Sequence, residues 1–340
     1  MKKSLVQLAL GLLIGGGFLY FAQRRIDLPE VWKLLSNCDA YLFSALCVSL
    51  TGVQLLRSER WLRTFSRSYG LLRRTVYRAF FLGNAANSFL PGRLGDLIRA
   101  GMIRQGHVEI GLGLAVGTVA IEKLADLTVV MALLLTLIFT MPLPSWVHDT
   151  AVTGLLILLS AVPVVLLVSW SHRALHRWET SARQGAIGTG LRAVMRILKG
   201  FVDAFQLAAN GHNIKWILFL SLLIWSLETV AVFLSIHSFG LDIPVTAAAL
   251  TLVLLSFGTM LPAAPGFVGT YQWLTVMALG FFSVDETLAF AIGVLLNFSV
   301  IIINVGTGLI AYFFLKCESR TKPAATYDAH LTKDRIHGSE

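Results

Sequence analysis

A short stretch of this chain, NSFLPGRLGDLIRAG at residues 87–101, places helix breakers and charges together between apolar runs. Proline stops an incoming helix, and glycine lets the chain turn and lets a ligand approach the backbone. A helix that starts after such a break presents free N–H groups and a positive dipole end, which attract anions. Arg93 and Arg99 add positive charge suited to bidentate phosphate contact. The stretch predicts an anion site, with a proline kink beside interfacial arginines as the alternative.

Further polar residues extend this candidate site toward the next apolar stretch. Glu122 and Asp126 are four residues apart and share a helix face, and Lys123 can pair with Asp126. Ionisable residues within a membrane usually face a cavity or the bundle interior. Two interpretations of these residues remain open. They could lie on a substrate or proton path, or they could form a buried ion pair that fixes helix packing. The candidate substrate-binding residues of this half are Asn84, Asn87, Pro91, Gly92, Arg93, Gly95, Asp96, Arg99, Glu122, Lys123 and Asp126.

A second break, LPAAPGFVGT at residues 261–270, resembles the first. The first break reads L-P-G-x-x-G, and the second reads L-P, three residues, then G-x-x-G. Because the second contains no arginine, we expect it to contact an anion through backbone N–H groups alone. Its candidate substrate-binding residues are Pro262, Pro265, Gly266, Gly269, Gln272 and Asn297. Glu228, alone in an earlier apolar stretch, is interpreted either as a hydrogen-bonded structural acid or as a proton-handling site.

The composition predicts that membrane helices position these residues. Of the 340 residues, 56% are hydrophobic and only 14% are charged. A crossing helix needs roughly 20 apolar residues. Stretches that approach or exceed this length run at about 5–22, 40–56, 111–140, 150–170, 214–236 and 288–315, and shorter pieces lie at 76–91, 246–261 and 268–283. The pattern predicts an all-α polytopic membrane protein with about six full crossings and two re-entrant or broken helix elements.

Lysine and arginine are distributed unevenly, which predicts the orientation. Residues 57–78 and 171–215 each carry seven, the tail after residue 315 carries five, and none lies between Lys215 and Lys316. By the positive-inside rule, both loops and both termini are cytoplasmic. Arg93, Arg99 and Arg104 place residues 92–110 on the cytoplasmic side as well, so the 76–91 piece must enter and leave on that side. The later short pieces form either a second re-entrant pair or two short crossings, and an inverted repeat is predicted.

The remaining segments are expected to serve the same single domain. Residues 1–316 form one transmembrane unit, residues 171–213 form an amphipathic cytoplasmic segment on the anionic leaflet, and residues 317–340 form a disordered cytoplasmic tail. The net charge of +9 favours anionic lipid over nucleic acid as a partner.

Metal, cofactor and catalytic chemistry are not expected. Cys38, Cys47 and Cys317 are far apart and form no metal or redox motif. His172 and His176 are spaced for a metal but lie in a basic segment without further ligands. Neither a nucleophile motif nor a catalytic carboxylate pair is apparent, so the chain is interpreted as a non-enzyme.

These motifs resemble the lysylphosphatidylglycerol synthase transmembrane-region family, also described as flippase-like integral membrane proteins. The likeness covers roughly residues 5–316 and rests on NSFLPGRLGDLIRAG, AIEKLADL, LPAAPGFVGTYQWL and SVDETLAFAIGVLLNF. Asp96 and Lys123 replace the family's usual Glu and Arg and keep the charge. Gln272 and Asn297 stand where many members carry a charged pair, which puts proton coupling through that half in doubt. With only 25 residues after residue 315, a fused synthase domain is not expected.

The resemblance implies a lipid-handling protein of the bacterial cytoplasmic (inner) membrane. Its implied function is to move a phospholipid or a polyprenyl- or isoprenoid-linked lipid between leaflets. The alternative is a membrane accessory protein or enzyme in lipid, hopanoid or glycolipid biosynthesis. The expected partners are a membrane lipid with an anionic headgroup and, under the alternative, lipid-biosynthesis enzymes.

Overall fold

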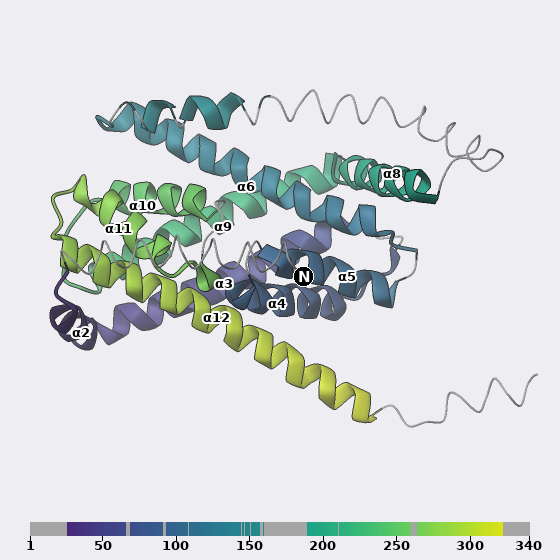
Figure 1. The fold of residues 1–340 in the computed structure, drawn as a ribbon, viewed down its shortest axis with the longest axis horizontal. Helices are drawn as coiled ribbons and strands as arrows, with labels where there is room; N and C mark the ends of the chain where they lie inside the picture. Colours follow the sequence, from purple (N-terminus) through teal and green to yellow (C-terminus); the bar gives the residue numbers. More distant parts are fainter. Residues whose placement is uncertain are drawn as a thin grey trace, which may run out of the picture.

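The structure is a computed structural model. It describes residues 26–65, 69–90, 93–107, 109–143, 145, 147–149, 151–156, 159, 189–209, 211–259 and 264–321. Within these ranges every regular element is helical (Figure 1). The elements are α2 (Leu28–Ser36), α3 (Ala40–Thr64), α4 (Arg73–Phe89), α5 (Leu94–Gly106), α6 (Leu112–Thr140), α8 (Thr189–Ala209), α9 (Gly211–His237), α10 (Val245–Gly258), the 3-10 turn η3 (Pro265–Phe267), α11 (Thr270–Gly280) and α12 (Glu286–Thr321).

Aspartates fix the starts of two of the long helices. The Asp39 carboxylate accepts hydrogen bonds from the backbone N–H groups of Tyr41 and Leu42 at 2.8 and 3.0 Å, directly before α3. Asp285 accepts in the same way from Thr287 and Leu288 at 2.9 and 3.1 Å, at the start of α12. Each side chain satisfies N–H groups that have no partner inside the helix.

Within the described ranges, four helices are long and apolar enough to cross a membrane, namely Ala40–Thr64, Leu112–Thr140, Asn213–His237 and Glu286–Phe314. They coincide with four of the six predicted crossings. The predicted crossing at 5–22 and most of the one at 150–170 lie outside the described residues, as do the segment 171–188 and the tail from residue 322. A polytopic helical membrane protein is confirmed, while the number of crossings stays a prediction.

Large apolar side chains lie exposed on these long helices. They include Leu218, Phe219 and Leu222 on α9 and Phe298, Ile302, Leu309 and Phe313 on α12. A soluble protein rarely exposes apolar surface so extensively, whereas lipid tails solvate it without cost. The exposed faces therefore fit an integral membrane protein.

The same order of helices occurs twice along the chain. A long helix, two short helices separated by a break, and a second long helix form α3–α6, and the order recurs in α9–α12 (Figure 1). Contacts follow this order: α3 packs on α4 as α9 packs on α10, and α5 on α6 as α11 on α12. Across the halves, α4 contacts α12 and α10 contacts α6. The contacts therefore repeat together with the helix order.

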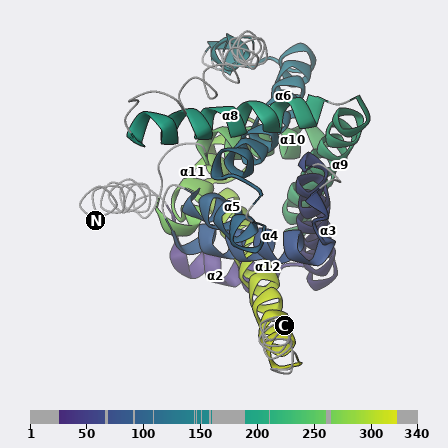
Figure 2. The ribbon, with the colours of Figure 1, turned by 90° about the vertical axis from the view of Figure 1, so that its right-hand side faces the viewer.

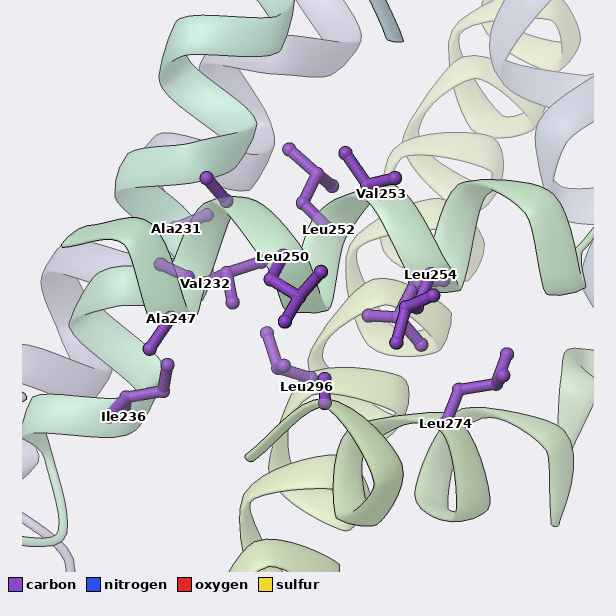
Figure 3. Close-up of a cluster of buried hydrophobic side chains, with 14 of the residues drawn as sticks. Ala231, Val232, Ile236, Ala247, Leu250, Leu252, Val253, Leu254, Leu274 and Leu296 are labelled. Atoms are coloured by element: carbon purple, nitrogen blue, oxygen red, sulfur yellow. The ribbon is translucent and has the colours of Figure 1, made fainter. Parts of the chain in front are cut away.

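Helix α10 is buried almost all round. Leu250 and Val253 are fully buried, and their neighbours pack against α9, α11 and α12 (Figure 3). Its 14 residues are too few to span a bilayer. At its C-terminal end the backbone N–H of Thr259 bonds to carbonyl oxygens of the same helix, those of Leu255 and Phe257.

Helix α8 lies across α6 (Figure 2) and meets it through glycines. A Cβ on Gly117 would lie 2.7 Å from Cβ of Ala204, and one on Gly200 would lie 2.5 Å from the backbone N of Leu114. Val202, which lies within the segment 171–213 expected on the lipid surface, is 2% exposed. Protein therefore covers part of the apolar face of that segment.

Candidate functional site: a charged cavity between two chain breaks

The two chain breaks lie against each other. The backbone of Arg93 is left-handed (φ 55°), directly before α5. Nη2 of Arg93 donates a hydrogen bond to Oγ1 of Thr259 at 3.0 Å, and its guanidinium lies 5.8 Å from the centre of the Phe267 ring. Asn297 Nδ2 donates to the carbonyl oxygen of Gly266 at 3.0 Å. Arg93 thus joins the break of the first half to that of the second, and Asn297 holds the second break to α12.

The first break is held by close contact between α4 and α5. A Cβ on Gly83 would lie 2.8 Å from the carbonyl oxygen of Gly95 and 2.9 Å from Cβ of Arg99. Two facing glycines let the backbones approach, as in membrane helix pairs with small residues. α4 and α5 therefore form a tight helical hairpin, consistent with the predicted re-entrant piece.

A cavity of about 220 Å³ lies beside the breaks, and both halves of the chain line it. Lining side chains come from α3, α4, α5 and α6 and from α9, α10, α11 and α12. Pockets that bury a whole drug-sized ligand usually measure roughly 300–1,000 Å³. The cavity therefore suits a small polar group rather than a complete lipid.

Charged side chains from different helices pair within this cavity. Arg60 and Asp126 form a bidentate pair at 2.7 and 3.1 Å, and Arg60 also donates to Ser221 at 2.8 Å. The remaining pairs are Arg57–Glu228 at 2.7 Å, Arg99–Glu122 at 2.6 Å and Lys123–Asp96 at 3.4 Å. Arg60, Arg99 and Glu122 are at most 2% exposed. Charges buried so deeply need such partners, because desolvation without pairing is costly.

Arg93 is the fifth basic side chain that lines the cavity, and it differs from the other four. Within the described part of the chain, no carboxylate lies within ion-pair distance of it. Its hydrogen-bond partner is the neutral hydroxyl of Thr259. With every group ionised, the five basic and four acidic lining side chains of the described residues leave one positive charge in excess. This arrangement can attract one negative charge.

A row of neutral amides lines the same cavity. Asn84 Nδ2 donates to Oε1 of Gln54 at 2.7 Å, and Nε2 of Gln54 in turn donates to Asn304. Asn87, one turn along α4 from Asn84, donates to the Asp96 carboxylate at 3.3 Å. Each amide offers both donor and acceptor groups. The row connects α3, α4 and α12, which belong to both halves.

Most of the predicted site residues are brought together in this cavity. Those that line it are Asn84, Asn87, Arg93, Asp96, Arg99, Glu122, Lys123, Asp126, Gly266 and Asn297. Gly95, Pro265, Gly269 and Gln272 do not line it. Pro91, Gly92 and Pro262 lie outside the described residues.

Two of the residues outside the cavity have a local structural role. Gln272 is 5% exposed, and its Oε1 accepts a hydrogen bond from the backbone N–H of Gly269 at 2.7 Å. Gly269 precedes α11 with φ 87°, a conformation that favours glycine. The pair therefore ends the break and starts α11.

The pairing of Lys123 differs from the sequence expectation. The carboxylate that Lys123 contacts belongs to Asp96 in α5, whereas Asp126 pairs with Arg60 in α3. The i, i+3 pair expected within α6 is therefore replaced by two pairs between helices. The reason is geometric, since each side chain meets an opposite charge on a neighbouring helix.

Sequence reasoning missed Arg57 and Arg60 as site residues. Both were assigned to a cytoplasmic loop or its membrane interface, yet α3 continues to Thr64 and both side chains line the cavity. Gln54 and Tyr271 were also missed. One signal was available: Gln54, Arg57 and Arg60 recur every three residues, which places them near one helix face.

The helix arrangement and this cavity define a class, namely polytopic helical membrane proteins with a polar, charge-paired centre between two broken helices. The chain belongs to the lysylphosphatidylglycerol synthase transmembrane-region family, whose sequence profile matches residues 8–308. The resemblance stated from the motifs is thereby confirmed.

Two relatives are distant in sequence. The chain is 26% identical over 300 residues to the glycosyltransferase AglD of Haloferax volcanii, covering 78% of this chain and 47% of that protein. It is 23% identical over 215 residues to a UPF0104 membrane protein of Methanocaldococcus jannaschii, covering 62% of this chain and 85% of that protein. The chain thus spans about half the length of AglD. No solved structure matches the chain.

Proposed function

We propose that this protein moves a lipid with an anionic headgroup between the two leaflets, with the headgroup in the central cavity and the tails in the bilayer. The observation that carries this proposal is the charge arrangement. Four basic side chains of the cavity are paired with four carboxylates, and Arg93 has the hydroxyl of Thr259 as its partner. A phosphate can replace that neutral partner with a stronger, charge-assisted one.

The position of Arg93 supports movement rather than simple binding. It lies at the contact between the two halves, and its present partner, Thr259, belongs to the second half. An anion that takes over the guanidinium would compete with this contact. In transporters, substrate sites likewise lie where broken helices of two repeats meet.

Two measurements test the proposal: leaflet exchange of a fluorescent phosphatidylglycerol in proteoliposomes, and the affinity of the protein for the same lipid. In the affinity measurement, Arg93→Ala should weaken lipid binding by about 10- to 150-fold, the equivalent of about 1.5–3 kcal/mol for a hydrogen bond to a charged group. Arg93→Lys should recover part of this, because a point charge replaces a planar fork. The matched control is Arg104→Ala, an exposed arginine of the same helix, which should change little.

Equal effects at Arg93 and Arg104 would indicate general attraction to the anionic leaflet and would contradict the proposal. Binding that depends on Arg93 without any leaflet exchange would favour the second candidate, an accessory role in glycolipid synthesis. That candidate draws support from the relative named a glycosyltransferase.

A further inference from the structure

We propose that the headgroup bound in this cavity is a phosphodiester that carries hydroxyl groups and no amine. This inference rests on the proposed function and narrows its substrate class. Three features of the cavity carry it: the size of the charge excess, the occupation of every carboxylate, and the row of amides beside Arg93.

The charge excess fits a single negative charge. Arg57, Arg60, Arg99 and Lys123 each face a carboxylate, so Arg93 is the one basic lining side chain that the described residues leave unneutralised. A phosphodiester carries one negative charge. It would balance the cavity, whereas a doubly charged phosphomonoester would leave one negative charge uncompensated in a site with little water.

The occupied carboxylates disfavour an amine. An ammonium group needs a carboxylate or several free acceptors when it leaves water. Glu122, Asp126 and Glu228 are each within 2.7 Å of an arginine nitrogen, and Asp96 is 3.3–3.4 Å from Arg99 and Lys123. An added ammonium would have to displace one of these cations. The cavity therefore repels headgroups that end in an amine.

The amide row suits hydroxyl groups. In the chain of bonds from Asn84 through Gln54 to Asn304, the described residues leave the Asn84 Oδ1 at one end and the Asn304 Nδ2 at the other without a partner. One end thus accepts and the other donates. A hydroxyl group can do both, so it can bind at either end.

The two parts of the proposed site are close enough for one headgroup. Asn84 and Asn87 are neighbours on one face of α4, about 5–6 Å apart at i, i+3. Asn87 contacts Asp96 in the first turn of α5, and Arg93 directly precedes that turn. A headgroup whose phosphate binds Arg93 would therefore extend its hydroxyl groups toward the face of α4 that carries these amides.

The experiment uses the purified full chain in mixed micelles and compares three lipids with identical acyl chains by native mass spectrometry. All three headgroups contain a phosphodiester. Phosphatidylglycerol also carries hydroxyl groups, phosphatidylethanolamine also carries an ammonium group, and phosphatidylethanol carries neither. We expect phosphatidylglycerol to bind about 3- to 10-fold more tightly than phosphatidylethanol, as for one or two neutral hydrogen bonds. Phosphatidylethanolamine should bind most weakly.

Two variants separate the contributions. Asn84→Leu should weaken phosphatidylglycerol binding by a larger factor than phosphatidylethanol binding, so that the preference between the two is lost, and Asn84→Ser should restore part of the preference. Arg93→Ala should weaken both anionic lipids by the same factor. An unchanged thermal unfolding profile for each variant establishes that the protein remains folded.

Equal binding of phosphatidylglycerol and phosphatidylethanol by the unaltered protein would overturn this inference and leave the proposed function standing. Tighter binding of phosphatidylethanolamine than of phosphatidylethanol would also overturn it, because the carboxylates would then be available to an amine. Equal binding of all three lipids would remove the proposed function as well.

Discussion

Replacing Asp126 by asparagine tests whether the ion pairs of the cavity hold the fold together. Arg60 is 1% exposed and donates to both carboxylate oxygens of Asp126, at 2.7 and 3.1 Å. Trp225 Nε1 donates to the same carboxylate at 3.0 Å. Removing one partner of a buried pair commonly costs about 3–5 kcal/mol, because the other charge is left uncompensated.

Two remaining contacts of Arg60 moderate this cost. Ser221 still accepts a hydrogen bond from Nη1 at 2.8 Å, and the Glu122 carboxylate lies 3.8 Å from Nη2. We therefore expect Asp126→Asn to lower the free energy of unfolding by about 3 kcal/mol, the lower end of that range. The double variant Arg60→Gln with Asp126→Asn should be more stable than Asp126→Asn alone, since it removes the uncompensated charge.

The measurement is unfolding by sodium dodecyl sulfate in mixed micelles, followed by the loss of helical circular dichroism. Asp149→Asn provides the matched control, because it makes the same chemical change at an exposed position. If Asp126→Asn and Asp149→Asn differ by less than about 0.5 kcal/mol, the usual range for surface substitutions, the pair does not stabilise the fold and the reasoning fails.

Two further predictions concern packing and orientation. Gly200→Ala should destabilise the protein by about 1–3 kcal/mol in the same unfolding assay, because its Cβ would meet the backbone of Leu114, whereas Gly101→Ala, with open space around it, should stabilise α5 by about 0.5–1 kcal/mol. If both substitutions changed the free energy of unfolding in the same direction, the result would contradict the contact between α6 and α8. In a cysteine-free background, an impermeant thiol reagent should label Leu72→Cys from the cytoplasm and Asp242→Cys from outside, both being exposed positions. The reverse pattern would refute the topology.

Hydropathy and helix breakers predicted the positions of the two chain breaks. The first break was expected at Pro91–Gly92, and α4 ends at Phe89 while α5 starts at Leu94. The second lies between α10 and α11, as the prolines and glycines of residues 261–270 indicated. Such signals are local, because proline, which has no N–H, and glycine, which has no Cβ, each change the backbone at their own position.

The ion pairs could not be predicted in this way. Arg60 and Asp126 are 66 residues apart, and only the rotation of α3 against α6 decides that they meet. The positive-inside rule counts arginines as loop residues, yet arginine is also a good helix former, so α3 continues through Arg57 and Arg60. Their burial depends on carboxylates that other helices supply.

The contact between α6 and α8 had a sequence signal that was not used. Gly113 and Gly117 are spaced by four residues, the pattern by which membrane helices approach closely. An apolar stripe on the partner helix is equally compatible with lipid and with protein as its cover. Only the spatial arrangement distinguishes the two, and here α6 packs on α8 and Val202 is buried by protein.

The different chemistry of two contacts in this molecule has a mechanical consequence. Within the α4–α5 hairpin, Gly83 and Gly95 bring backbone against backbone, so the two helices cannot slide past one another without collision. Between the tip of the hairpin and the second half, a single hydrogen bond runs from Arg93 to Thr259, while α4 packs against α12. Hydrogen bonds can be exchanged for others, whereas close-packed backbones cannot yield. The α4–α5 hairpin can therefore keep its shape while the hydrogen bond from Arg93 at its tip is exchanged for another partner.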